Sequence, residues 1–214
     1  KGFIDKFIGD AVMALFPSGE ETAIDAAIAV HKLLRIYNTE NEGKPGFPIK
    51  LGIGLHTGKL MLGTIGDRGR LDTTVISDAV NLASRIESLT KSYGAGILVS
   101  EDVLAKVKNK DKYSIRYVDR VAVKGKTEPV TIVEILEGLP EEEKEIKLAT
   151  KADFEHAVNF YQSGNLTVAR NLLHKILRKN PDDRAAGLYL SRCNDRRKNR
   201  NSHLCDGVEV LDFK

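Results

Sequence analysis

The sequence contains no tryptophan and only two cysteines, Cys193 and Cys205, among its 214 residues. Two thiols cannot build the disulfide framework of a small secreted scaffold, so a reducing compartment is expected. No apolar run approaches the roughly 18 residues that cross a bilayer, and no signal peptide is visible. We therefore expect a cytoplasmic protein with no membrane segment in this chain; any membrane tether would lie outside it.

Neither sign of charge predominates strongly, because 33 lysines and arginines balance 30 aspartates and glutamates and leave a net charge of +3. So small an excess gives no strong field for a nucleic acid or an anionic membrane, and no nucleic-acid partner is expected. The hydrophobic content of 42% is ordinary for a globular protein. The length suits one medium-sized domain and a smaller one.

Short apolar runs at 3–8 and 11–16 meet at Gly9-Asp10, which predicts a β-hairpin with an aspartate at its tight turn. Residues 18–21 (SGEE) are typical of a capping box at the start of a helix. Further strands are expected at 49–56, 60–65, 96–100, 114–123 and 130–136. Helices between these strands and several hairpins indicate an α+β fold with a mixed, mainly antiparallel sheet.

One helix places an amide and a guanidinium together. In the run 78–85 (DAVNLASR), Asn81 and Arg85 lie one helical turn apart. The apolar side chains Ala79, Leu82, Ala83 and Ile86 share a different face, which can pack against a core. A guanidinium is well matched to phosphate oxygens. The spacing alone also fits a solvated surface pair. Ser77 directly before the helix could serve as its N-cap.

Three further stretches carry a resemblance. They are 2–16 (GFIDKFIGDAVMALF), 51–66 (LGIGLHTGKLMLGTIG) and 123–126 (VKGK). Together with the Asn81 helix, in this order, they closely resemble the class III adenylyl and guanylyl cyclase catalytic domain, of bacterial and soluble adenylyl cyclase type. The resemblance implies a ferredoxin-like cyclase domain over 1–137.

The resemblance also implies roles for individual residues. Asp10 matches one of two metal-binding aspartates, for Mg²⁺ or Mn²⁺, two ions per complete site. Asn81 is similar to the residue that orients the ribose, and Arg85 to the one that stabilises charge on the reacting phosphate. Lys124 matches the lysine that holds the terminal phosphates, and Lys6 and Thr74 match the positions that read the purine. His56, in an apolar strand, is expected to be structural.

The segment that carries the family's other metal aspartate precedes the hairpin, and this chain begins at Lys1. We therefore expect a catalytic domain without its first strand and helices, inactive by itself. In the family the site lies between two catalytic domains. Because this chain carries residues of both halves of that site, the resemblance implies a homodimer with two equivalent sites.

Hydrogen-bonding groups indicate which purine base the site binds. A lysine donor and a threonine hydroxyl complement the N1 acceptor and N6 donor of adenine, whereas the guanine donors call for a carboxylate. Lys6 and Thr74 therefore favour an adenylyl cyclase that converts ATP into cyclic AMP and pyrophosphate. A guanylyl cyclase and a non-catalytic, cyclase-like interaction module are the alternatives.

A charged linker is expected over 138–150, which includes the run PEEEKE. The pattern then changes over 151–195 to that of one tetratricopeptide repeat, carried by Phe154, Ala157, Phe160, Gly164, Ala169, Leu173, Ile176 and Pro181. Such a helical hairpin cannot bury its apolar face alone, so it must pack on the first domain, on a protein partner or on further repeats. Residues 182–194 are expected to add a covering helix, and 196–214 to form a solvated basic tail.

Overall fold

The computed structural model describes residues 1–67, 70–122, 129–198 and 209–210, with the backbone alone for Leu62, 64–67, 70–76 and 209–210. The strands are β1 (Phe3–Ile8), β2 (Ala11–Leu15), β3 (Ile53–Leu55), β4 (Met61–Asp67), β5 (Arg70–Ile76), β6 (Ile97–Ser100), β7 (Ile115–Ala122), β8 (Val130–Ile135) and β9 (Glu209–Val210). The helices are α1 (Glu20–Glu40), α2 (Asp78–Tyr93), α3 (Glu101–Lys106), the 3₁₀ turn η1 (Lys110–Lys112), α4 (Glu141–Gln162), α5 (Leu166–Lys179) and α6 (Arg184–Lys198).

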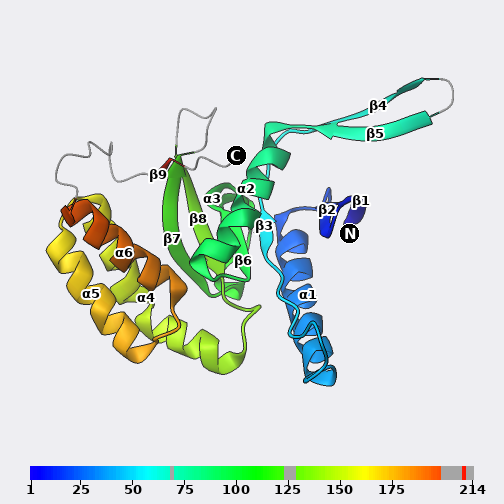
Figure 1. Ribbon diagram of the computed structural model, residues 1–214. Helices are drawn as coiled ribbons and strands as arrows, with labels where there is room; N and C mark the ends of the chain where they lie inside the picture. Colours follow the sequence, from blue (N-terminus) through cyan, green and yellow to red (C-terminus); the bar gives the residue numbers. More distant parts are fainter. Residues whose placement is uncertain (68–69, 123–128, 199–208, 211–214) are drawn as a thin grey trace.

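The central sheet has the strand order β3-β6-β8-β7-β9. β8 pairs antiparallel with both β6 and β7, while β3–β6 and β7–β9 are parallel pairs. Two hairpins, β1–β2 and β4–β5, form separate two-stranded sheets, and the second extends away from the body of the molecule (Figure 1). The predicted mixed, mainly antiparallel α+β architecture is confirmed.

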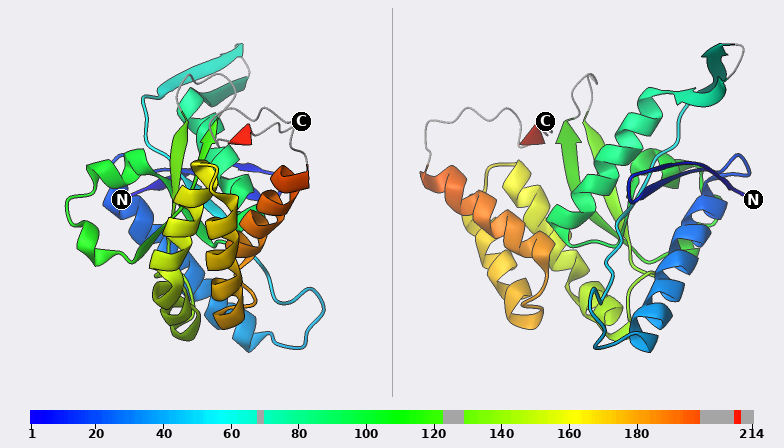
Figure 2. Two further views of the ribbon diagram at one scale, coloured as in Figure 1. Left: turned by 90° about the vertical axis from the view of Figure 1, so that its left-hand side faces the viewer. Right: turned by 45° about the vertical axis from the view of Figure 1, so that its right-hand side comes forward.

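Different helices cover the two faces of the central sheet (Figure 2). Successive side chains of a strand point to opposite faces, so neighbouring residues pack against different helices. Ile97 and Val99 pack with Ile24 and Ile28 of α1 and with α3. Leu98, between them, packs on the opposite face with α2 and the C-terminal helices. The structure is therefore a three-layer arrangement, with α1 and α3 on one side and α2 with α4 and α6 on the other.

Glycines of the β3 region bring α2 close to the sheet. A Cβ on Gly54 would clash with the backbone of Glu87 and Ala83, and one on Gly52 with the side chain of Thr90. Gly58 likewise faces the methyl group of Ala79. The close approach of strand and helix backbones explains why this stretch is so rich in glycine.

Local predictions fail at several boundaries. The capping box at Ser18 does not form, since α1 begins after Gly19 with no side-chain cap and the Ser18 hydroxyl donates to the Lys1 carbonyl. The strand expected over 49–56 is reduced to β3, and β5 was not expected as a strand. The expected linker 138–150 is wrong: its residues from Glu141 onwards form the first half of α4, where Lys147 and Thr150 are buried.

The C-terminal helices share one core with the cyclase-like part. Phe154, Ala169 and Leu173 belong to the same apolar cluster as Leu82 and Ile86 of α2. The covering helix expected over 182–194 is confirmed as α6. The prediction of a solvated tail over 196–214 fails in part. α6 continues to Lys198, and Arg196 in its last turn packs over the Tyr161 ring. Further on, β9 pairs with β7.

Candidate active site

Helix α2 presents Asn81 and Arg85 away from the core. Ser77 is its N-cap and accepts a hydrogen bond from the Ala79 amide at 3.0 Å, as expected, while its hydroxyl donates to the Lys59 carbonyl. Leu82 and Ile86 are buried on the inner face, Asn81 is exposed and Arg85 is half-buried. The cap and the packed inner face fix the helix, so the amide and the guanidinium share a defined outer face.

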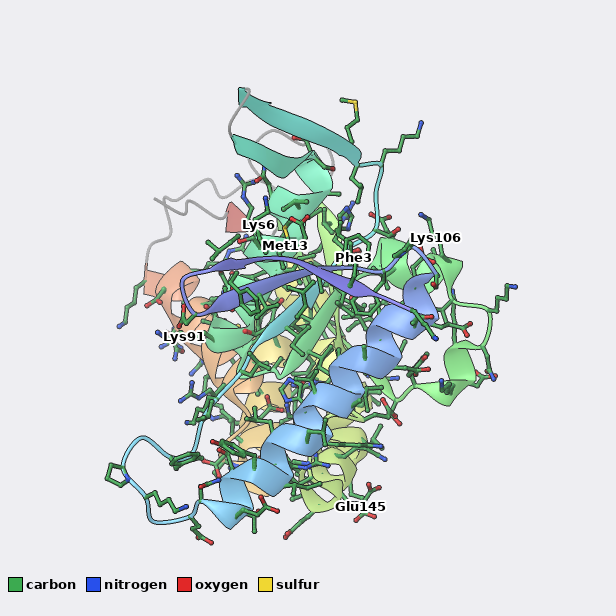
Figure 3. The ribbon with its side chains drawn as sticks, turned by 90° about the vertical axis from the view of Figure 1, so that its right-hand side faces the viewer. Phe3, Lys6, Met13, Lys91, Lys106 and Glu145 are labelled. Atoms are coloured by element: carbon green, nitrogen blue, oxygen red, sulfur yellow. The ribbon has the colours of Figure 1, made fainter. Side chains whose placement is uncertain are left out.

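The β1–β2 hairpin carries Asp10 and Lys6. Ile8 pairs with Ala11, so Gly9 and Asp10 form a two-residue turn in which Gly9 takes a φ of +62°. Asp10 is exposed at the tip of the hairpin. Lys6 pairs with Met13 near the middle of the hairpin (Figure 3).

Asp5 is a charged neighbour of Lys6 that the sequence did not single out. Its side chain is only 5% exposed, and its Oδ2 lies 3.4 Å from Lys6 Nζ, within ion-pair distance but outside hydrogen-bond geometry. Lys6 is half-buried beside it. The carboxylate and the ammonium therefore lie side by side on the hairpin.

Two further predicted site residues are described only in part or not at all. Thr74 pairs with Gly63 in the β4–β5 hairpin, and only its backbone is described. Lys124 lies outside the described residues. The structure therefore brings Asn81 and Arg85 together on α2, and Asp10 and Lys6 together on β1–β2, with Thr74 on a third element.

Polar contacts anchor the chain after β3, next to α2. His56 Nδ1 lies 2.7 Å from the Ser100 hydroxyl, and the His56 side chain is 4% exposed. Thr57 donates to Glu20 Oε1 at 2.9 Å and accepts from Lys106 Nζ at 3.0 Å. Thr57 therefore joins the chain after β3 to α1 and α3, while His56 joins it to the end of β6. The buried His56 contact fits the structural role expected for it.

Among the residues that the structure describes, no group of three or more histidine, cysteine, aspartate or glutamate side chains is gathered as a metal site. Over the same residues, no helix has the length and apolar character needed to cross a membrane.

Comparison with known proteins identifies the family. Residues 5–135 match the model of the adenylate and guanylate cyclase catalytic domain. The chain belongs to this family. The chain is 49% identical over 140 residues to an adenylate cyclase of Anabaena cylindrica, covering 63% of this chain and 28% of the relative. A solved structure of the adenylyl cyclase CyaB from P. aeruginosa has a TM-score of 0.52 at 32% identity, covering 63% of this chain and 71% of that one.

A second relative extends the similarity. The terminal-differentiation-specific adenylate cyclase of Dictyostelium discoideum is 34% identical over 196 residues, covering 90% of this chain and 9% of the relative. Because that alignment spans 90% of the chain, it must include most of α4 to α6 as well as the cyclase domain. The chain spans less than a third of the length of either curated relative.

Proposed function

We propose that this chain is the catalytic part of an adenylyl cyclase that converts ATP into 3′,5′-cyclic AMP and pyrophosphate. The observation that carries the proposal is the outer face of α2, where Asn81 and Arg85 lie one turn apart on a capped and packed helix. Two relatives named as adenylate cyclases, at 49% and 34% identity, support the same activity.

The chemistry is phosphoryl transfer, in which the ribose 3′-hydroxyl attacks the α-phosphorus and pyrophosphate leaves. We assign Asn81 to the orientation of the ribose, through its amide, and Arg85 to the charge that develops on the reacting phosphate. A guanidinium held on a rigid helix stabilises that charge without reorganising during the step. Lys124 is assigned to the terminal phosphates.

A divalent metal, Mg²⁺ or Mn²⁺, is implied by the family, and Asp10 is the residue that would hold it. Mg²⁺ is usually bound by one or two carboxylates together with substrate phosphates and water, rather than by an all-protein cage. An exposed carboxylate at a tight turn fits one such ligand position. A bound metal would neutralise charge on the phosphate oxygens.

We assign adenine recognition to Lys6 and Thr74. The ammonium of Lys6, paired with Asp5, is a donor and therefore complements the N1 acceptor of adenine. The same ammonium would face the N1 donor of guanine, which disfavours a guanylyl cyclase. The family includes guanylate cyclases, so that activity is the second candidate.

We further propose that the site is completed by a second copy of the chain. The metal ligand Asp10 and the catalytic pair on α2 belong to different elements. Large apolar side chains on the β1–β2 hairpin are exposed, namely Phe3, Ile4, Phe7, Ile8 and Val12. Apolar groups gathered in this way are typical of surfaces that become covered on association.

The C-terminal helices are proposed to be tetratricopeptide-like and to have a protein partner, with Phe160 among their exposed apolar side chains. A purely non-catalytic interaction module is the remaining alternative, and the presence of Asp10, Asn81 and Arg85 argues against it.

A product assay tests the proposal. The full-length protein, supplied with a divalent metal, is expected to form cyclic AMP and pyrophosphate from ATP in equal amounts. It should form less cyclic GMP from GTP at equal concentration. Preferential cyclic GMP formation would favour the guanylyl alternative, and formation of neither product would support the non-catalytic module.

A further inference from the structure

A buried polar cluster joins the C-terminal end of α2 to α6. Tyr93, the last residue of α2, donates from its hydroxyl to Asp119 Oδ2 of β7. Arg192 of α6 donates to the same carboxylate oxygen at 2.8 Å, and to the Tyr93 hydroxyl at 3.3 Å. Three elements that are far apart in the sequence therefore meet at one carboxylate.

This cluster is built into the interior. Tyr93 is 1% exposed and Asp119 is 5% exposed. The Arg192 guanidinium also lies 5.0 Å from the centre of the Tyr189 ring, and the Tyr189 hydroxyl donates to the Val118 carbonyl at 3.1 Å. Burial and the nearby Asp119 carboxylate raise the pKa of Tyr93, which keeps its hydroxyl protonated as a donor. Both oxygens of the buried Asp119 carboxylate are thus hydrogen-bonded, one by Tyr93 and Arg192 and the other by the Arg120 amide.

The cluster acts on the helix that carries the catalytic pair. Tyr93 follows Arg85 by two turns of α2, about 12 Å along the axis at 1.5 Å per residue. Near Tyr93, α2 ends at Gly94 in the left-handed conformation, with a φ of +63°, and a Cβ there would meet the Arg184 side chain of α6. α6 therefore contacts the end of α2 at two points, while Ser77 caps its start and the β3 region packs along 83–90 through Gly54 and Gly52.

We propose that Arg192 is a positioning residue of the cyclase: from α6 it holds the C-terminal end of α2, and thereby sets where Asn81 and Arg85 lie. This inference rests on the proposed function. A helix moves largely as one body, so a loss of restraint at Tyr93 would displace Arg85 relative to the reacting phosphate. Small misplacements of a catalytic group lower the rate strongly while leaving much of the binding intact. The helical segment is then a working part of the catalytic unit, as well as a platform for partners.

Helix α6 offers a matched control one turn further on. Arg196 also packs over a tyrosine ring, at 4.8 Å from the centre of Tyr161, and donates to the Tyr161 carbonyl at 3.1 Å. Tyr161 belongs to α4, so this arginine restrains the helical segment alone. Arg192→Gln and Arg196→Gln remove the same charge and the same kind of ring contact, but only the first releases α2.

The experiment has two measurements on the full-length protein. Exchange of the backbone amide hydrogens of 86–93 is expected to be about tenfold faster in Arg192→Gln, because the end of α2 then opens locally more often. In Arg196→Gln it is expected to be unchanged. In turnover of ATP, Arg192→Gln is expected to lower kcat about tenfold or more with KM changed about twofold or less. Arg192→Lys, which keeps the charge beside Asp119, should recover part of kcat. If Arg192→Gln does not fold, Tyr93→Phe removes the hydroxyl alone and is measured in its place.

The outcomes separate the two claims. Equal exchange in the two glutamine variants would overturn the proposal, as would an unchanged kcat in Arg192→Gln. A wild-type protein that forms no cyclic nucleotide would overturn the proposed function and the catalytic role of Arg192 with it. In that case the exchange measurement still decides whether Arg192 holds α2.

Discussion

Arg116 of β7 donates to Asp183 Oδ2 at 2.6 Å, and both side chains are fully buried. Arg116 also pairs with Glu134 of β8, whose other oxygen accepts from Lys147 of α4 at 2.6 Å. Asp183 in addition accepts from the Ala186 amide at the start of α6. One buried network therefore joins the central sheet to the helical segment that follows it.

Asp183→Ala is expected to destabilise the protein by about 3–5 kcal/mol, because it leaves the buried Arg116 guanidinium without one of its partners. The control is Lys175→Ala, which breaks the exposed ion pair with Asp153 at 2.9 Å and should cost about 1 kcal/mol or less. Denaturant unfolding measures both. Equal losses of unfolding free energy in the two variants would show that the buried network stabilises the protein no more than an exposed ion pair does.

Arg85→Ala is expected to lower kcat by about 10²-fold or more while changing KM far less, because it removes a charge that matters most in the transition state. Lys91→Ala, an exposed lysine of the same helix, is the control and should leave both constants unchanged. Steady-state kinetics with ATP separates the two. A change confined to KM would assign Arg85 to substrate binding instead.

Lys6→Glu combined with Thr74→Cys should shift base preference from ATP towards GTP, because a carboxylate accepts from the guanine donors and cannot donate to adenine N1. Lys6→Glu alone should already impair the use of ATP. The quantity to measure is the ratio of kcat/KM for ATP to kcat/KM for GTP. A ratio that stays constant in the double variant would mean that this pair does not read the base.

His31 predicts a pH dependence of stability. Its Nε2 lies 3.0 Å from the Gly96 carbonyl, and burial, assisted by the nearby Arg35, lowers the pKa of His31. In the unfolded chain a histidine has a pKa of about 6.5. Below that pH, His31 therefore binds a proton more readily in the unfolded chain than in the folded one. Stability is therefore complete above that value and falls as the pH drops below it.

The comparison is the shift in Tm between pH 7.5 and 5.5, each roughly one unit from the unfolded pKa. His31→Gln should lose less stability over this interval than the wild type, since its amide does not titrate. His156→Gln, at an exposed histidine of α4, should behave as the wild type. The same pH response in His31→Gln would remove His31 as the cause.

The β1–β2 hairpin and the Asn81 helix were predictable because their signals are local. Gly9-Asp10 between two apolar runs specifies a tight turn, and Ser77 before a periodic apolar face specifies a capped helix. The family and its fold followed from four ordered motifs, and the match over residues 5–135 confirms them. The individual roles of the site residues remain predictions.

The sequence could not show how the helical segment joins the sheet. Arg116 and Glu134 occur in strands whose other buried positions, Asp119 excepted, are apolar, and charged residues are rarely buried unless they are paired. Their partners are Lys147, in the expected linker, and Asp183, at the start of the expected covering helix. Only the tertiary structure brings these four together, which is why Glu141 to Thr150 was wrongly expected to be a linker.

Complementation between two inactive variants tests the central claim, a cyclase site shared by two copies of the chain, most directly. Asp10→Ala and Arg85→Ala variants of the full-length protein should each form very little cyclic AMP. In a mixed dimer, one site combines the intact Asp10 of one copy with the intact Arg85 of the other, so random mixing should restore about a quarter of the wild-type activity. A mixture that stays as inactive as its components, although mixed dimers form, would contradict the account.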